Sequence, residues 1–131
     1  MPDDVLLEAA RAVQRHAYAP YSGYRVGAAL EAMDGQIFVG CNVESASYGL
    51  TVCAERSALV AAVGAGRRAF RRIVVVSDSD PPASPCGACR QMLAEFGLGL
   101  RVDAVGPAQA QTWTLAELLP DAFTSHRLEA S

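Results

Sequence analysis

Two short cysteine-containing stretches constrain this chain more than any other feature of its sequence. They are residues 51–56 (TVCAER) and residues 84–90 (SPCGACR). Thr51 can cap a helix in the first stretch, and Ser84 can cap another in the second, where a proline takes the first helical position. Helix starts that follow strands meet at one edge of an α/β sheet. We therefore expect the three thiols and the carboxylate of Glu55 to lie close together.

The hydrophobic pattern predicts an α/β fold in a single domain, residues 1–131. Residues 73–76 (IVVV) are typical of a central strand covered on both faces, and Asp-Gly at 34–35 indicates a hairpin. The other expected elements are a helix from Asp3 or Asp4 to before Pro20, strands at 24–30 and 36–41, a loop at 42–50, a helix from Thr51 to the glycines at 64–66, a helix from Ser84 to near Gly97, strands at 100–105 and 112–113, and a capping-box helix from Thr114 to before Pro120. This order implies a mixed sheet with helices on both sides.

Charge and composition narrow the classes of partner. With 131 residues, 51% of them apolar, the chain can bury a core without disulfides. Its net charge of -3 does not suit a nucleic-acid-binding protein, which would present a basic face. It has no run of roughly 20 apolar residues that could span a membrane, and its first residues lack the basic start of a signal peptide. We expect a cytoplasmic protein whose cysteines are reduced thiols or metal ligands.

The pair Cys86 and Cys89 allows three interpretations. Cysteines three residues apart face the same way on one helical turn and can grip one ion, but this spacing also occurs in redox pairs and in closed structural zinc sites. Cys53 offers a third sulfur, which leaves a fourth tetrahedral position open, as in a catalytic zinc site. Glu55 could act as a general base beside that position. Cys41 could instead close the site, although a buried reduced thiol is the simpler interpretation.

Two arginines adjoin the expected ligands, and neither histidine is placed to be one. Three thiolates on a divalent ion leave a net negative charge, which weakens the action of the ion on water. Arg56 and Arg90 could offset this charge by hydrogen bonding to the sulfurs, and we favour that role for Arg56 only. His16 is expected on the first helix and His126 in the C-terminal tail, so both are interpreted as surface or packing residues.

Several motifs resemble those of a known family. CAE at 53–55 followed by PCGAC at 85–89 is similar to the pattern of the cytidine deaminases, in particular their short, three-cysteine, homotetrameric type. The resemblance extends along nearly the whole chain, through YAPYS at 18–22, RVGAA at 25–29, GCNVE at 40–44, ASYGL at 46–50 and LLPDAF at 118–123. Ser45 departs from it, because asparagine is common at that position.

The resemblance implies a three-layer α/β/α sandwich around a five-stranded mixed sheet. It also implies one Zn²⁺ per subunit, held by Cys53, Cys86 and Cys89, with Glu55 as the proton shuttle. The substrate-binding positions that it implies are Tyr24, Asn42, Glu44, Tyr48, Ala54 and Phe123.

These substrate-binding positions would serve different parts of the ligand. Asn42 and Glu44 would hydrogen-bond the sugar hydroxyl, since alternate residues at a strand end point the same way and a carboxylate accepts from a hydroxyl. Tyr24 takes the place of the phenylalanine that usually lies against the base, so the aromatic face is kept and a hydroxyl is added. Tyr48 and Phe123 would reach the site of a neighbouring subunit in the homotetramer.

The activity implied is zinc-dependent hydrolytic deamination of cytidine and 2′-deoxycytidine to the uracil nucleosides, with release of ammonia, in pyrimidine salvage. A free nucleoside is the expected substrate, because Glu44 disfavours a 3′-phosphate and the sugar-binding segment has no Lys or Arg. One alternative is a deaminase of the same fold that acts on another aminonucleoside, such as blasticidin S. Another is an interaction module stabilised by structural zinc, with Cys41 as the fourth ligand.

Overall fold

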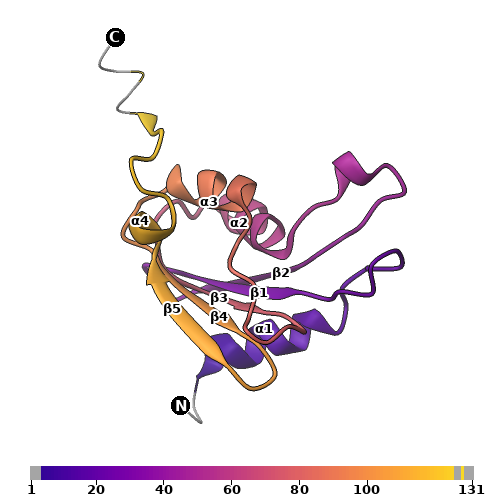
Figure 1. The fold of residues 1–131 in the computed structure, drawn as a ribbon. Helices are drawn as coiled ribbons and strands as arrows, with labels where there is room; N and C mark the ends of the chain where they lie inside the picture. Colours follow the sequence, from indigo (N-terminus) through magenta and orange to yellow (C-terminus); the bar gives the residue numbers. More distant parts are fainter. Residues whose placement is uncertain (1–3, 126–127, 129–131) are drawn as a thin grey trace.

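The structure, a computed structural model, describes residues 4–125 and Leu128. Figure 1 shows a central sheet with helices above and below it. In chain order the elements are α1 (Val5–Gln14), β1 (Gly27–Ala32), β2 (Ile37–Cys41), the 3-10 helix η1 (Tyr48–Leu50), α2 (Ala54–Gly64), β3 (Phe70–Val76), α3 (Gly87–Ala94), β4 (Arg101–Val105), β5 (Ala110–Thr114) and α4 (Leu115–Leu118).

The sheet is five-stranded and mixed, as predicted, with the order β2-β1-β3-β4-β5. β1 runs antiparallel to both β2 and β3, β3 runs parallel to β4, and β5 returns antiparallel to β4. The parallel pair lies at the centre of the sheet. Its carboxyl ends are therefore the place where side chains for a site are expected to gather.

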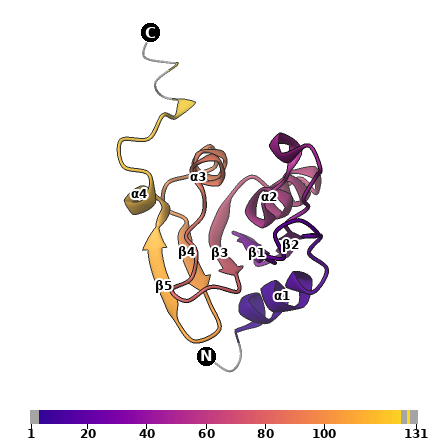
Figure 2. The same ribbon diagram turned by 45° about the vertical axis from the view of Figure 1, so that its right-hand side comes forward.

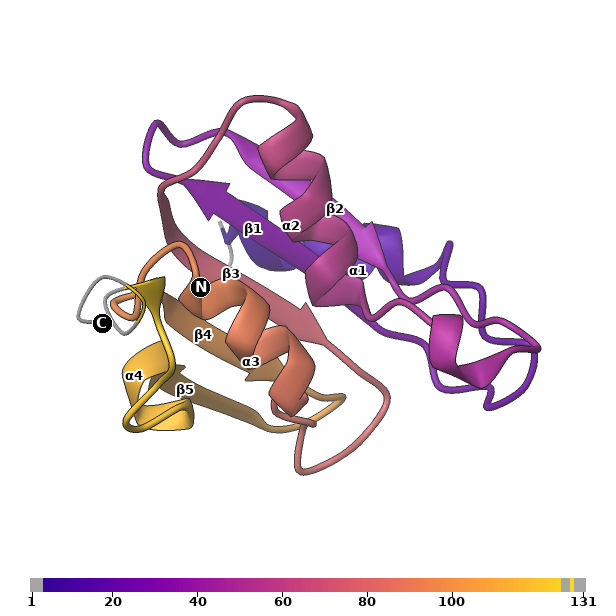
Figure 3. The same ribbon diagram turned by 90° about the horizontal axis from the view of Figure 1, so that it is seen from above.

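Two hydrophobic clusters make this a three-layer α/β/α sandwich. In β3, Ile73 and Val75 face the cluster under α2 and α3, while Val74 and Val76 face the cluster over α1. This alternation follows from the two-residue period of a strand, so a continuous β-branched run serves both layers. Figure 2 shows α1 on one face of the sheet and α2 on the other, and Figure 3 shows α2 and α3 side by side over the same face.

Two glycines let the helices approach the hairpin closely. A Cβ atom at Gly27 would lie 2.1 Å from the carbonyl oxygen of Ala10 in α1, and one at Gly40 would lie 2.4 Å from the amide nitrogen of Ala58 in α2. Any larger residue would push a helix away from the sheet. The contact at Gly40 fixes the distance between the sheet and α2, whose first turn carries Glu55.

The structure corrects the expected starts of α2 and α3. Thr51 is not the cap of α2 and Ser84 is not the cap of α3, because each helix begins later, with a cysteine at the N-cap position. The Thr51 hydroxyl instead accepts a hydrogen bond from the Ser45 amide at 3.1 Å, and the Ser84 hydroxyl accepts one from Arg90 at 2.9 Å. Both hydroxyls that were expected to cap a helix are therefore hydrogen-bonded to other groups.

Other differences from the expectations are small. The first strand begins at Gly27 and not at Tyr24, β5 spans five residues rather than two, and the expected loop at 42–50 contains η1. His16 lies just beyond α1 and not on it, and His126 lies outside the described residues. The capping box of Thr114 and Glu117 is confirmed. Within the described part of the chain, every helix is too short or too polar to cross a membrane.

Candidate active site

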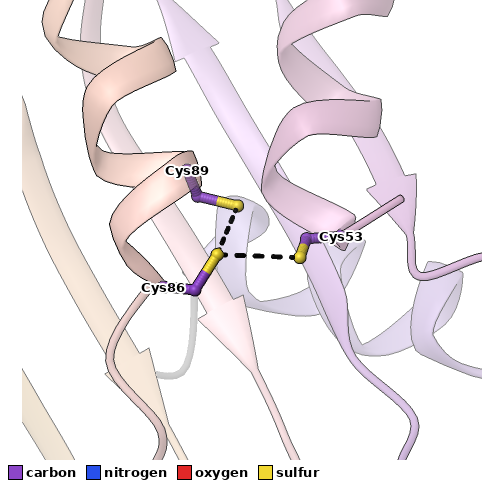
Figure 4. Close-up of side chains that lie close together, drawn as sticks. All are labelled: Cys53, Cys86 and Cys89. Atoms are coloured by element: carbon purple, nitrogen blue, oxygen red, sulfur yellow. Dashed lines mark hydrogen bonds between the residues drawn. The ribbon is translucent and has the colours of Figure 1, made fainter. Parts of the chain in front are cut away.

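The sulfurs of Cys53, Cys86 and Cys89 form a compact group at the starts of α2 and α3. All three lie within 4.8 Å of one another. The Cys53 and Cys86 sulfurs are 3.8 Å apart, and those of Cys86 and Cys89 are 3.5 Å apart (Figure 4). Ligands at the corners of a tetrahedron, with Zn–S bonds of about 2.3 Å, stand about 3.8 Å apart. The donor set and its spacing therefore fit zinc.

The helix starts explain how this group is built. Cys53 is the N-cap of α2 and Cys86 is the N-cap of α3, both with extended backbone. Cys89 lies in the first turn of α3 and is fully buried. Free backbone amides and the positive end of each helix dipole meet the sulfurs there, which favours thiolates over thiols. Cys41, at the end of β2, is not part of the group, so among the described residues three sulfurs and not four converge.

Hydrogen bonding within the group favours one thiolate. The bond from Cys89, assisted by the Arg56 guanidinium and Cys86, outweighs burial and lowers the pKa of Cys53 to about 5. The same bond raises the pKa of Cys89, and burial and the charge of Glu55 act in the same direction. Cys53 is therefore the sulfur that carries negative charge most readily, and a cation placed in the group would be met by an ionised ligand.

The two neighbouring arginines have different partners. The Arg56 guanidinium donates to the Cys53 sulfur at 3.6 Å and to the Thr51 carbonyl at 3.4 Å. Its Nε is buried and has no hydrogen-bond partner in the described part of the chain. Arg90 instead donates to the carbonyls of Pro85 and Leu118, each at 2.7 Å. The contact expected of Arg56 is present, whereas Arg90 braces the start of α3 against α4.

A cavity of about 210 Å³ opens beside the sulfurs. Six of the residues singled out from the sequence line it: Tyr24, Asn42, Cys53, Ala54, Glu55 and Cys86. Its other lining residues are Val26, Thr51, Val75, Ser77, Ala83 and Ser84. These residues include no Lys or Arg. The described cavity therefore suits an uncharged, partly aromatic ligand better than an anion.

Glu55 is the one acidic residue among the described residues that line this cavity, and it is 5% exposed. Burial raises the pKa of its carboxyl above the usual value, and the charge of Cys53 adds to the rise. A carboxyl whose pKa is moved toward neutrality can both take and return a proton. Its place beside three sulfurs and inside a cavity is the arrangement of a general acid-base group next to a metal.

The residues expected to bind the sugar are already engaged with the protein. The Asn42 side chain donates to the Tyr24 carbonyl at 2.8 Å and accepts from the Val26 amide at 2.9 Å. The Glu44 carboxylate accepts from the Tyr21 and Ser22 amides at 3.0 and 3.2 Å, and also from the Ser22 hydroxyl. The bond from the Ser22 hydroxyl is the main reason why the pKa of Glu44 is lowered.

Three expected substrate-binding residues lie outside this cavity. Glu44 and Tyr48 line a neighbouring surface hollow together with Tyr21, Ser22 and Thr51. Tyr48, in η1 at the tip of a loop that extends beyond the sheet, is 75% exposed, and Phe123 is 59% exposed. Within one subunit the structure therefore gathers the metal group, Glu55, Ala54, Asn42 and Tyr24, but not these three residues.

Sequence reasoning missed two serines near the cavity. Ser77 follows β3 directly and is buried, and the position after a central parallel strand was a signal that could have found it. Ser79 hydrogen-bonds the Tyr24 hydroxyl at 2.9 Å. No local pattern marks Ser79, since its partner lies 55 residues away in the chain.

Comparisons with known proteins agree with this geometry. Residues 1–102 match the family model described as the cytidine and deoxycytidylate deaminase zinc-binding region. A cytidine deaminase from Sporosarcina psychrophila is 43% identical over 130 residues, covering 98% of this chain and 96% of the relative. Another, from Halalkalibacterium halodurans, is 46% identical over 127 residues, covering 95% and 96%.

Solved structures give the same result. The crystal structure of cytidine deaminase from Burkholderia pseudomallei matches with a TM-score of 0.89 and 49% identity, covering 94% of this chain and 100% of that one. The structure of cytidine deaminase from Mycobacterium tuberculosis matches with a TM-score of 0.78 and 39% identity, covering 90% and 94%. The chain therefore belongs to the cytidine and deoxycytidylate deaminase family, and its three cysteines are placed to hold the zinc ion of that family.

Proposed function

We propose that this protein deaminates cytidine and 2′-deoxycytidine, converting each with one water into the uracil nucleoside and ammonia. The observation that carries the proposal is the buried carboxylate of Glu55, which lines the same cavity as Cys53 and Cys86. The relatives named cytidine deaminase, similar over nearly the whole chain, support the choice of substrate.

Cys53, Cys86 and Cys89 would hold the zinc. When bound, zinc supplies Lewis acidity, which makes water a nucleophile at neutral pH. Glu55 would take a proton from the attacking water and deliver it to the ring nitrogen next to the reacting carbon. It would then pass the second proton of that water to the departing amino group, so that ammonia leaves and the carboxylate is regenerated. Burial raises the pKa of Glu55, which makes its carboxylate a stronger base and so eases each uptake of a proton.

The remaining residues of the cavity would orient the nucleoside. The first backbone amides of α2, beginning at Ala54, have no partner within the helix and can donate to an oxygen of the base. Tyr24 offers an aromatic face, and Asn42 stands beside it on the same wall. Glu44 would reach a sugar hydroxyl by exchanging its bonds to Tyr21 and Ser22. The lining residues that the structure describes include no Lys or Arg, so the nucleoside is favoured over its phosphate.

We also propose that four subunits assemble and that Tyr48 and Phe123 complete sites across the interfaces. Both residues are largely exposed in the single subunit, which leaves their side chains available to a neighbouring one. A reducing, cytoplasmic location would suit a site made of thiolates, and a role in pyrimidine salvage would follow from the reaction.

The test is ammonia release from cytidine by the zinc-loaded protein, with Glu55→Gln as the matched variant. The substitution keeps the side-chain volume but removes the group that carries the proton. We expect kcat to fall by about 10²- to 10⁴-fold or more. Zinc content, measured by atomic absorption, should stay at one ion per chain.

Two results would contradict the proposal. A loss of only a few-fold in the variant would remove Glu55 as the proton shuttle. No ammonia from cytidine with the folded, zinc-loaded wild type would reject the substrate, and release from blasticidin S would then favour the other aminonucleoside.

A further inference from the structure

Tyr24 is held at three separate atoms, two in its backbone and one at the end of its side chain. Its amide donates to the Ser22 hydroxyl at 3.0 Å, and its carbonyl accepts from Asn42 at 2.8 Å. At the far end of the ring, its hydroxyl forms a 2.9 Å hydrogen bond with the hydroxyl of Ser79. The backbone bonds set where the ring begins, and the Ser79 bond sets where it points.

Ser79 is itself fixed from behind by the turn between β4 and β5. Its carbonyl oxygen packs so closely on Gly106 that a Cβ atom there would lie 2.2 Å away. The carboxylate of the next residue, Asp80, accepts from the amides of Ala108 at 3.1 Å and Gln109 at 3.1 Å. The Ser79 hydroxyl that bonds Tyr24 therefore belongs to a segment that is held in place. Because this segment is fixed, the position of the Ser79 hydroxyl determines the position of the Tyr24 ring.

The bond joins the two walls of the cavity. Tyr24 belongs to the segment that enters β1, and Ser79 belongs to the segment that leaves β3 and leads to the α3 cysteines. Without the bond, the Tyr24 ring would be held only through its backbone and could rotate about its side-chain torsions. A rotating ring must become ordered when a base binds against it. The free-energy cost of ordering the ring then weakens the binding of the base.

We propose that Ser79 is a positioning residue, which fixes the Tyr24 ring as the aromatic wall against which the cytosine base binds. This inference rests on the proposed deamination of cytidine. Besides Tyr24, the Ser79 hydroxyl meets the Ser77 hydroxyl at 3.4 Å. Within the described residues, the Tyr24 and Ser79 hydroxyls do not bond Glu55 or a cysteine, so the pair acts on substrate binding and not on proton transfer.

The test is a double-mutant cycle on the kinetics of cytidine deamination. Ser79→Ala should raise KM roughly two- to tenfold, the range expected for one hydrogen bond, with kcat changed less than about twofold. Tyr24→Phe should do the same, because it removes the other half of the bond. The double variant should be no worse than either single variant, since the one interaction is already lost.

Two further variants control the cycle. Ser79→Thr keeps the hydroxyl and should restore a KM close to that of the wild type. Tyr18→Phe removes the hydroxyl of an exposed tyrosine that forms no side-chain hydrogen bond in the described part of the chain, and should leave KM unchanged. A purely structural loss would instead lower the fraction of active enzyme. The apparent kcat would then fall with constant KM, and active-site titration would show fewer working sites.

The outcomes separate this inference from the function on which it rests. A wild-type protein that releases no ammonia from cytidine rejects the proposed function. An active wild type with additive effects of Ser79→Ala and Tyr24→Phe, or with losses confined to kcat, rejects the positioning role and leaves the function in place.

Discussion

At the scale of single residues, Arg56 is the side chain whose contact with the metal group makes the sharpest prediction. It donates to the Cys53 sulfur, which carries negative charge most readily. Arg56→Ala removes this donor, so zinc affinity should fall about 10- to 100-fold, as is typical when an outer hydrogen bond to a ligand is lost. Competition for zinc with a chromophoric chelator measures the change without any need for activity.

A matched arginine shows whether charge alone explains the effect. Arg68 is exposed and forms no hydrogen bond or ion pair within the described residues, so Arg68→Ala changes the net charge equally without touching the sulfurs. Its zinc affinity should match that of the wild type. Equal zinc affinities for the Arg56→Ala and Arg68→Ala variants would contradict a role of Arg56 in supporting the zinc site.

The metal group was predictable residue by residue, whereas much of the cavity wall was not. Cysteine spacing and the nearby carboxylate are local signals, and the zinc interpretation is confirmed over the redox pair and the four-sulfur site with Cys41. The bond between Tyr24 and Ser79 and the engagement of Glu44 by Ser22 depend on how distant segments pack. Side-chain contacts of this kind leave no trace in a local pattern.

At the scale of elements, α1 is tied to the sheet by an ion-pair network centred on Arg72 of β3. Its guanidinium binds the Asp4 carboxylate at 2.8 Å and the Asp103 carboxylate at 2.6 Å. Asp4 also caps α1 through the Leu7 amide. The network therefore links the start of the first helix to the two central strands.

This network predicts a pH dependence of stability. The hydrogen bond from Arg72 lowers the pKa of Asp4 below its usual value of 3.8, and for Asp103 the bonds from Thr112 and Arg72 outweigh an opposing effect of burial. Because both folded-state pKa values are depressed, the stabilisation is present above about pH 4 and is lost as the pH falls through those values.

Arg72→Met tests the network, since methionine retains apolar volume but removes the cation that Asp4 and Asp103 share, leaving Asp103 with only the longer ion pair to Arg101 at 3.2 Å. The free energy of unfolding in urea should fall by about 2–3 kcal/mol at pH 7, and the gap from the wild type should shrink below pH 4 as the carboxylates protonate. Other carboxylates titrate in both proteins, so the difference isolates the network. A gap that stays constant from pH 7 to pH 3 would contradict this assignment.

The elements themselves followed from the pattern, but their starts did not. The hairpin, the β-branched centre of β3 and the capping box of α4 rest on local chemistry and were predicted correctly. The predicted caps of α2 and α3 were wrong because the Thr51 hydroxyl bonds the Ser45 amide and the Ser84 hydroxyl bonds the Arg90 guanidinium. The cysteines take the cap positions instead, which is where their sulfurs can meet.

At the scale of the whole molecule, zinc should act as a clamp between α2 and α3. Cys53 belongs to one helix start, and Cys86 and Cys89 belong to the other. Zinc binds only when these starts are held together, so it stabilises the folded state by about 2.7 kcal/mol when free zinc is at 100 times its dissociation constant.

Removal of zinc with a chelator should therefore lower the midpoint of thermal unfolding, and adding zinc back should restore it. Cys86→Ser, which weakens the site, should show a smaller response to the chelator than the wild type. If the wild-type unfolding curve were the same with and without the chelator, zinc would not couple the two helices.

Assembly of the whole molecule can be tested through Phe123. The Phe123 backbone is held against α3, because its carbonyl accepts from Gln91 at 2.8 Å, yet the residue is 59% exposed and lies outside its own subunit's cavity. A fixed backbone with a projecting ring suits a side chain that serves a neighbouring subunit. Phe123→Ala should then raise KM for cytidine while zinc content stays unchanged.

Subunit mixing tests whether the ring crosses an interface. Subunits with Glu55→Gln lack the proton shuttle but keep Phe123, and subunits with Phe123→Ala keep the shuttle. In a mixed tetramer, the first kind can supply the ring to an intact site of the second kind. Activity at low cytidine should therefore exceed the sum of the two separate variants, with light scattering confirming four subunits. Activity equal to that sum in proven mixed tetramers would mean that each site is complete within one subunit.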